Sequence, residues 1–187
     1  MAELSDEGIA ATVQAGDAEA FGELIERYEA KLKRYARKFL NTNHEIEDLV
    51  QDVFIKSYTN IQSFDVHQKF SPWIYRIAHN TFVNELKRKD RSGFRLFDAD
   101  TVFPFLAAPE TADSETLQSE LSQEMNEHVE KLSSKYREVI ALHYFESLSY
   151  QEISDILQIP VTTVGVRMTR ARAKLKEYYQ SNQPHHE

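Results

Sequence analysis

The strongest constraint on the fold of this chain is a recurrence of apolar residues at spacings of three and four, which marks one face of an α-helix. After Asp17, a suitable N-cap, the apolar stripe comprises Phe21, Leu24, Ile25, Tyr28, Leu32, Tyr35 and Phe39. Only five Gly and five Pro occur in 187 residues, so few positions interrupt long helices. The sequence therefore predicts an all-α protein whose first helix begins near Asp17.

A second helix is expected from about Glu45 to Asn60, after a polar loop at residues 41–43. Its inner, apolar face comprises Ile46, Leu49, Val50, Val53, Phe54 and Tyr58. Its outer face comprises Glu47, Asp48, Gln51 and Asp52. Such an amphipathic helix covers a core on one side and presents an acidic surface on the other.

A third helix is expected to begin at Pro72. Ser71 can act as its cap, and Pro is well suited to the first helical position. Phe70, just before the cap, can pack onto Tyr75 and fix the entry of the chain. The helix should continue to about Arg88, before a polar break.

The acidity of the chain is concentrated in one segment. The net charge of −8 argues against a strong attraction to nucleic-acid phosphates. Residues 96–130, however, hold nine acidic residues and no Lys or Arg, so the remainder carries a net charge of +1. The run can be a solvated linker or a strand-like mimic of nucleic acid. We expect two small helical domains, residues 1–95 and 117–187, joined by an acidic linker at residues 96–116.

The C-terminal domain has the pattern of a helix-turn-helix. Ser149 and Glu152 form a capping box, which predicts a short helix over about residues 150–157. After a three-residue turn, a last helix is expected over about residues 161–179. The buried stripe of this last helix should comprise Val164, Met168, Ala171 and Leu175.

The last helix also carries polar and basic side chains away from its buried stripe. These are Thr162, Thr163, Val166, Arg167, Thr169 and Arg170, followed by Arg172, Lys174 and Lys176. Helical hairpins are common in ordinary protein cores, but this basic face suits the major groove of DNA and its phosphates. We therefore favour DNA binding over a purely structural hairpin.

A second candidate nucleic-acid surface lies at the start of the third helix. Polar side chains follow one another there at steps of three and four, at Arg76, Asn80, Asn84 and Lys87. Aromatic residues crowd the entrance beside Lys69, namely Phe64, Phe70, Trp73 and Tyr75. Aromatic faces next to cations hold unstacked bases, at about 1–3 kcal/mol per base. The alternative is that these rings are core, which we accept for Phe70 and Ile74 and leave open for Trp73.

The sequence contains no pattern typical of catalysis, a metal site or a cofactor. There is no Cys, the seven His lack metal-ligand spacing, and no glycine-rich phosphate loop or nucleophile elbow occurs. We assign no catalytic residue and no small-molecule substrate. The first residues lack a basic region followed by an apolar run, and no stretch reaches the roughly 18–20 apolar residues of a membrane-spanning helix. A cytoplasmic location is therefore expected.

Three stretches follow one another along the chain: DLVQDVF at residues 48–54, KFSPWIYRIAHN at residues 69–80, and the helix-turn-helix at about residues 150–169. Together they resemble the extracytoplasmic-function (ECF) group of sigma-70-type RNA polymerase sigma factors. The resemblance covers about residues 17–88 and 132–178. It implies a factor that binds core polymerase and directs promoter recognition and transcription initiation, in a stress or envelope response.

The resemblance also implies roles for particular residues. The second helix would dock on the clamp coiled coil of the largest polymerase subunit through Asp48, Leu49, Gln51, Asp52 and Phe54. The minus 10 element would be bound as melted single strand through Phe64, Lys69, Trp73, Tyr75, Arg76, Asn80, Asn84 and Arg88. The minus 35 element would be read as duplex through Thr162, Thr163, Val166, Arg167, Thr169, Arg170, Arg172 and Lys174.

Two positions depart from the family pattern. Gly165 and Val166 stand where a basic residue and then Ser are often found, and a Gly inside a helix costs about 1 kcal/mol relative to Ala. The minus 35 preference therefore stays open. Asn84 stands where Asp is frequent, which should alter support of the helix more than recognition. The family is commonly held inactive by membrane anti-sigma factors, so a partner of this kind is expected.

Two other functions fit parts of the pattern. A conventional helix-turn-helix regulator would use its N-terminal helices to dimerise or to sense a signal, and would need no polymerase. A protein-binding scaffold would hold a partner with the same helices, and its basic face would only be solvated. Transcription from a promoter library with added core polymerase distinguishes the three functions.

Overall fold

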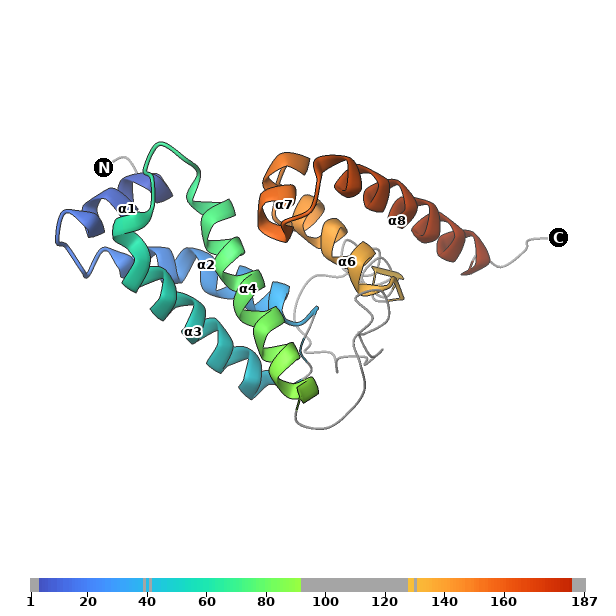
Figure 1. Cartoon of the computed structure of the whole chain (residues 1–187), viewed down its shortest axis with the longest axis horizontal. Coiled ribbons are helices and arrows are strands. Elements are labelled where there is room, and N and C mark those ends of the chain that lie inside the picture. The colour runs from blue at the N-terminus through green and yellow to red at the C-terminus, as the bar shows by residue number, and fades with distance from the viewer. Residues whose placement is uncertain (1–3, 39, 41, 92–127, 130, 183–187) are drawn as a thin grey trace, which may run out of the picture. The chain divides into compact units, whose positions relative to one another are not determined.

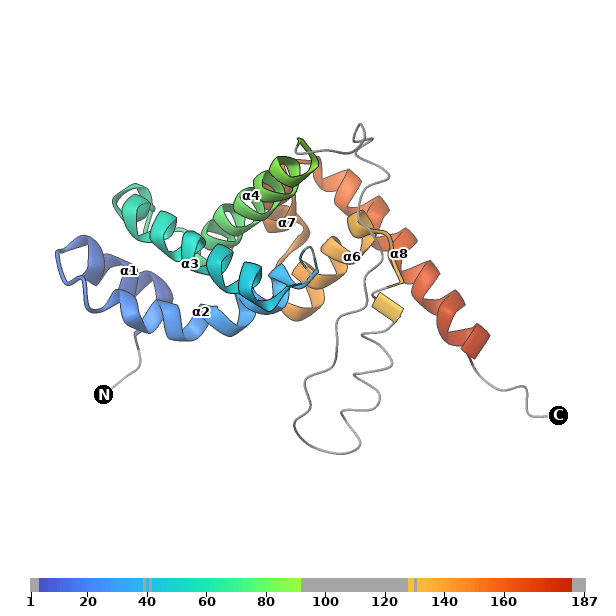
Figure 2. The same cartoon turned by 90° about the horizontal axis from the view of Figure 1, so that it is seen from below.

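The computed structural model describes residues 4–38, 40, 42–91, 128–129 and 131–182, and every regular element within them is helical (Figures 1 and 2). The prediction of an all-α protein is confirmed. The chain divides into two compact units, one built mainly on the N-terminal helices and one built mainly on the C-terminal helices. The acidic linker expected at residues 96–116 lies outside the described residues.

The N-terminal unit is a bundle in which long helices enclose an aromatic core. Its elements are α1 (Asp6–Gln14), α2 (Phe21–Ala36), α3 (Asn43–Asn60), η1 (Ile61–Ser63) and α4 (Phe70–Arg91). α3 packs against both α2 and α4, as the two views show, and α1 packs against α2 and α4. Phe70 and Ile74 are completely buried in α4, which confirms their interpretation as core.

The helix α1 is not among the helices expected from the sequence. It is nine residues long, and its buried residues are Ile9, Ala10 and Val13. Its N-terminus is capped by Ser5, whose Oγ accepts a 3.1 Å hydrogen bond from the backbone N–H of Gly8. The Asp6 carboxylate then accepts hydrogen bonds from Arg27 at 2.7 Å and from Tyr28 at 2.5 Å. Contacts with α2 therefore hold a helix whose own apolar stripe is short.

The helix predicted to begin near Asp17 begins later. Oδ1 of Asp17 accepts hydrogen bonds from the backbone N–H groups of Glu19 and Ala20, at 3.1 and 3.3 Å. These bonds close a turn, and α2 begins only at Phe21. Asp17 is thus a capping residue of the turn that leads into α2, and the first helix of the structure is α1.

The start of α4 also differs from the prediction, which placed it at Pro72. The helix begins at Phe70, so Ser71 and Pro72 lie within its first turn, where Pro is tolerated. The backbone N–H of Phe70 donates a 3.0 Å hydrogen bond to Oε1 of Glu7. A side chain of α1 therefore satisfies an N-terminal donor of α4.

The predicted helix-turn-helix is present in the C-terminal part of the chain. Within residues 128–182 its elements are α6 (Ser134–Ile140), the π-helical turn η2 (Ala141–Phe145), α7 (Tyr150–Leu157) and α8 (Val161–Asn182). α6 packs against α8. Gln158 begins the turn between α7 and α8 and has a φ of 54°, a left-handed conformation that ends α7.

The capping box before α7 is confirmed. The backbone N–H of Ser149 donates to Oε2 of Glu152 at 2.7 Å, and the backbone N–H of Glu152 donates to Oγ of Ser149 at 3.2 Å. Of the predicted buried stripe of α8, Val164, Met168 and Ala171 are completely buried, whereas Leu175 is only partly buried. These two features fix where the last two helices begin and which face α8 turns inward.

Candidate functional site

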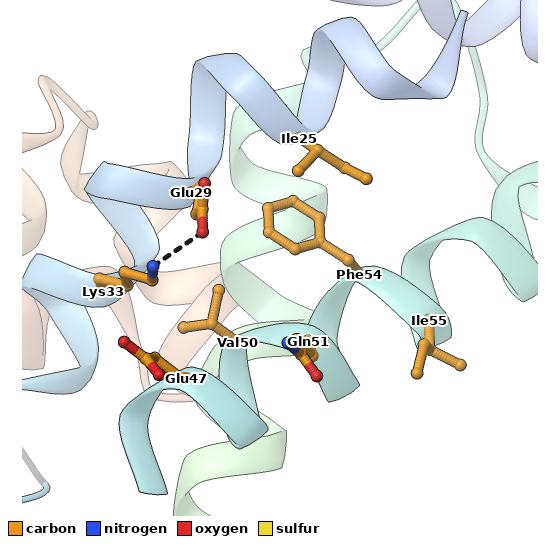
Figure 3. Close-up of a pocket in the computed structure, with 8 residues that line it drawn as sticks. All are labelled: Ile25, Glu29, Lys33, Glu47, Val50, Gln51, Phe54 and Ile55. Atoms are coloured by element: carbon orange, nitrogen blue, oxygen red, sulfur yellow. Dashed lines mark hydrogen bonds and ion pairs between the residues drawn. The ribbon is translucent and has the colours of Figure 1, made fainter. Parts of the chain in front are cut away.

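A groove of about 610 Å³ lies between α2 and α3 on the N-terminal unit (Figure 3). It is lined by Ile25, Glu29 and Lys33 from α2 and by Glu47, Val50, Gln51, Phe54 and Ile55 from α3. Figure 3 shows the ring of Phe54 extending from α3 toward Ile25. Glu29 and Lys33 form an ion pair of 2.7 Å along α2. The groove thus combines an apolar floor with charged groups on its rim.

The structure places the residues expected to dock on polymerase in two settings. Gln51 is exposed in the groove, whereas Phe54 is 7% exposed and packs edge-on against Phe21 at the floor. Leu49 is partly buried. Asp48 and Asp52 project from α3 into solvent, where Oδ2 of Asp48 lies 2.9 Å from Nδ1 of His44 and Oδ2 of Asp52 lies 3.9 Å from Nζ of Lys56. Exposed pairs of this kind contribute little stability, so both carboxylates can exchange their partners.

The sequence did not identify the α2 side of this groove. Ile25 belongs to the apolar stripe that was expected to be core, yet it is only partly buried and lines the groove. Ile55 on α3 is 61% exposed and was not singled out. Stripe position predicts which way a residue faces, but not whether a neighbouring helix covers it. An apolar residue beside the acidic outer face was the signal that could have indicated Ile55.

Three aromatic rings meet at the start of α4. The ring centroids of Phe64, Phe70 and Trp73 lie 5.2 to 5.4 Å from one another. Phe64 and Phe70 are buried, whereas Trp73 is partly exposed. Trp73 is therefore the ring of this cluster that reaches the surface, and the other two support it from behind.

Two residues assigned to the minus 10 strand lie in the core. Phe64 is 4% exposed and Tyr75 is 1% exposed. The Tyr75 ring packs edge-on against Tyr35, with centroids 5.4 Å apart. Burial of this degree does not fit direct contact with DNA. We correct the assignment of Phe64 and Tyr75, which pack the core that holds Trp73 and α4.

A row of exposed polar side chains follows along α4. Its members are Arg76, Asn80, Asn84 and Arg88, all exposed and four residues apart, so they share one helix face. Lys69 is exposed just before the helix. Nε and Nη2 of Arg88 each donate a 2.7 Å hydrogen bond to the Glu85 carboxylate, which partly neutralises the far end of the row.

The residues expected at the minus 35 duplex lie along α8. Those exposed are Thr162, Val166, Thr169, Arg170, Arg172 and Lys174, whereas Thr163 and Arg167 are partly buried. The Thr169 hydroxyl donates a 3.0 Å hydrogen bond to the carbonyl of Gly165, so it is engaged within the helix. A Cβ added at Gly165 would meet nothing within 4 Å, so no packing contact requires glycine there.

Arg172 has a partner that the sequence did not indicate. Its Nε donates a 2.9 Å hydrogen bond to the hydroxyl of Tyr144, and its guanidinium carbon lies 5.6 Å from the centre of the Tyr144 ring. Tyr144 belongs to η2 and is 55% exposed. The pair adds an exposed aromatic ring to the basic face of α8.

The described residues contain neither a candidate metal site nor a candidate membrane span. Among them, no group of three or more His, Asp or Glu is arranged to hold a metal ion. None of the helices in the described ranges combines the length and the apolar character needed to cross a membrane.

Comparison with known proteins gives matches in both units. Residues 24–92 match the model of Sigma-70 region 2, and residues 122–175 match that of Sigma-70, region 4. The chain is 36% identical over 173 residues to the ECF RNA polymerase sigma factor SigW of Bacillus subtilis, covering 88% of this chain and 91% of that protein. It is 35% identical over 184 residues to the ECF RNA polymerase sigma-E factor of Haemophilus influenzae, covering 95% of this chain and 97% of that protein.

A solved structure has a similar fold. The sigma factor RpoE from Bartonella quintana, determined in complex with the anti-sigma factor NepR, matches with a TM-score of 0.69 at 25% identity. The match covers 87% of this chain and 98% of that chain.

Proposed function

Since this chain belongs to the extracytoplasmic-function group of sigma-70-type RNA polymerase sigma factors, we propose that its two units divide promoter recognition between the surfaces described above. Sigma factors direct promoter recognition and transcription initiation without being enzymes. In this proposal residues 1–95 act in core binding and minus 10 melting, and residues 117–187 act at the minus 35 element. Residues 96–116 link them, and the family implies a stress or envelope response.

The groove between α2 and α3 is the proposed contact for the clamp coiled coil of the largest polymerase subunit. Its apolar floor, with Phe54 at its base and Ile55 exposed at its edge, can bury side chains of a partner helix. The exposed carboxylates of Asp48 and Asp52 on the same helix can pair with basic groups around such a contact. Apolar burial would supply most of the affinity and the carboxylates would favour a basic partner.

The surface at the start of α4 is the proposed site for the melted minus 10 strand. Trp73 offers a partly exposed ring that is held by Phe64 and Phe70, so stacking a base on it requires little reordering. The exposed row that begins at Arg76 and ends at Arg88 can follow the strand with donors to phosphates and base edges.

The exposed face of α8 is the proposed contact for the minus 35 duplex. Arg170 and Lys174 are exposed cations four residues apart, which suits contacts to successive phosphates or to guanine edges. Val166 lies nearer the start of α8 than these two cations and is 49% exposed. An apolar side chain at this position can pack on thymine methyl groups.

An anti-sigma factor is the proposed regulatory partner. The similar structure of RpoE contains the anti-sigma factor NepR, and we extend that type of partner to this chain, with a membrane anti-sigma factor as the expected form. We also propose that the chain acts in the cytoplasm, where core polymerase and promoter DNA are present.

One observation supports the proposal most strongly. The N-terminal unit contains both the apolar groove between α2 and α3 and the partly exposed ring of Trp73, which lies at the start of the polar face of α4. The test adds the purified chain to core polymerase and sequences the transcripts made from a promoter library. We expect initiation at a defined set of promoters that share minus 10 and minus 35 elements.

Other outcomes assign the chain to other functions. Binding to duplex DNA without polymerase-dependent initiation would indicate a helix-turn-helix regulator and would overturn the proposal. Neither initiation nor duplex binding would indicate a protein-binding scaffold and would also overturn it.

A further inference from the structure

One side chain of α1, that of Gln14, holds the beginning of the loop that leads from η1 into α4. Nε2 of Gln14 donates hydrogen bonds to the backbone carbonyls of Ile61 at 2.7 Å and Phe64 at 2.8 Å. In return, Nε2 of Gln62 donates to the carbonyl of Gln14 at 3.2 Å. Both donor hydrogens of the Gln14 amide are therefore used on carbonyls that are 47 and 50 residues away along the chain.

The same helix holds the second end of the loop. Oε1 of Glu7 accepts the 3.0 Å hydrogen bond from the backbone N–H of Phe70, the first residue of α4. Glu7 and Gln14 stand seven residues apart in α1, which places them on one face of that helix, two turns apart. α1 thus spans residues 61–70 and fixes them at both ends.

Between these two ends the loop has its own turn. The backbone N–H of His67 donates to Oδ1 of Asp65 at 3.0 Å, and the backbone N–H of Gln68 donates to the carbonyl of Asp65 at 2.9 Å. The side chains of Asp65, His67, Gln68 and Lys69 are exposed, whereas the ring of Phe64 is buried against Trp73. The loop therefore presents polar side chains to solvent next to the proposed stacking ring.

We propose that α1 is a positioning element for strand capture, in which Gln14 and Glu7 fix residues 61–70 and thereby set base discrimination at the minus 10 element. This inference rests on the proposed function of the surface at the start of α4. α1 precedes residues 24–92, which are those that match the Sigma-70 region 2 model, so the match does not include this helix.

The physical reason is preorganisation. A loop that is fixed before binding loses less conformational entropy when a strand binds, and it holds its polar side chains in one arrangement that favours particular bases. Without the Gln14 donors, the carbonyl of Phe64 would lose this hydrogen bond, and the carbonyl of Ile61 would keep only the 3.0 Å hydrogen bond from the backbone N–H of Phe64. The loop would then sample other conformations. The groove between α2 and α3 does not include Gln14 or Glu7 in its lining, so polymerase binding would be unaffected.

The test uses the full chain with core polymerase and the substitution Gln14→Met, which keeps the length of the side chain and removes both donors. Fluorescence anisotropy measures the affinity of the holoenzyme for single-stranded oligonucleotides that carry the preferred minus 10 sequence or a single-base change. We expect the ratio of these affinities to fall by about 3- to 10-fold, as the loss of a hydrogen bond implies. The affinity for core polymerase should stay at the wild-type value.

Thr12→Val is the matched control on the same helix. The Thr12 hydroxyl donates only within α1, to the carbonyl of Gly8 at 3.0 Å, so its loss should leave base discrimination unchanged. Glu7→Gln provides a second variant should Gln14→Met fail to fold, because it keeps an acceptor oxygen for Phe70 and removes only the charge. We expect a smaller fall in the affinity ratio for this variant.

Three results would overturn the inference. The first is an affinity ratio unchanged in Gln14→Met or, where that variant does not fold, in Glu7→Gln. The second is an equal loss of core binding, duplex binding and discrimination, because that pattern indicates general destabilisation. The third is an equal fall in Thr12→Val. A wild-type chain that opens no promoter with core polymerase would instead overturn the proposed function itself.

Discussion

The hydroxyl of Tyr28 donates a 2.5 Å hydrogen bond to Oδ2 of Asp6, and Nη1 of Arg27 donates to Oδ1 of the same carboxylate at 2.7 Å. One carboxylate of α1 therefore joins two adjacent residues of α2. Burial raises the pKa of Tyr28 well above its ordinary value, and the hydrogen bond to Asp6 raises it further. The neutral hydroxyl is thus the form that the folded protein prefers.

A first prediction concerns stability at alkaline pH. Because the pKa of Tyr28 is raised in the folded state, its contribution is complete below the ordinary tyrosine pKa of 10.0 and is lost as the pH rises above it. Tyr28→Phe should lower the free energy of unfolding at neutral pH by about 1 kcal/mol. It should also flatten the loss of stability above that pKa. Urea unfolding across this range measures both effects, with Tyr58→Phe, at an exposed ring, as the control. Equal slopes for wild type and Tyr28→Phe would contradict the prediction.

A second prediction concerns the groove between α2 and α3. Ile55 lines it and is 61% exposed, so Ile55→Glu should leave folding intact and remove an apolar contact with polymerase. We expect core affinity to fall by about 10-fold, which corresponds to about 1.4 kcal/mol. Thr59→Glu adds the same charge at an exposed position of α3 that does not line the groove, and it should bind normally. Similar affinities for the two variants would count against the groove.

A third prediction separates strand opening from duplex binding. Trp73→Ala removes the exposed stacking surface and should impair open-complex formation by about 1–3 kcal/mol. Duplex binding should change little, and Trp73→Phe should retain most of the opening activity because it keeps a ring. Permanganate footprinting measures opening and gel shift measures duplex binding. An equal loss in both assays would refute the role of Trp73.

A fourth prediction concerns phosphate contacts of α8. Arg170→Ala should weaken binding to the minus 35 duplex and reduce the slope of log affinity against log salt by about 1. Arg172→Ala should reduce the slope less, because the Arg172 guanidinium also contacts Tyr144. Titrations at several salt concentrations measure both slopes. An unchanged slope for Arg170→Ala would rule out its phosphate contact.

A fifth prediction concerns glycine. Gly165 lies in the second turn of α8, and a Cβ there meets nothing within 4 Å, so Gly165→Ala should stabilise the C-terminal unit by about 0.5–1 kcal/mol. Gly16→Ala provides the contrast. A Cβ there also meets nothing, but φ is +111°, so the substitution should destabilise the chain. Thermal unfolding distinguishes them, and a destabilised Gly165→Ala would show that glycine has another role there.

Much of the helical architecture could be predicted because its causes are local. The capping box at Ser149 and Glu152 joins groups three residues apart, and the buried stripe of α8 repeats every three or four residues. The start of α4 was misplaced for the opposite reason. Its N-terminal donor is satisfied by Glu7, which is 63 residues away and belongs to a helix with too short an apolar stripe to be expected.

The candidate site shows the same division. By itself, the sequence determined that a cluster of aromatic residues precedes a polar helix face and that the outer face of another helix is acidic. It also determined that the second helix of a helix-turn-helix has a basic face. Only the tertiary structure decided that Trp73 reaches the surface while Phe64 and Tyr75 are buried, and that Gln14 holds the loop beside them. Helix periodicity states which residues share a face, but whether that face meets solvent or another helix depends on packing between segments far apart in the chain.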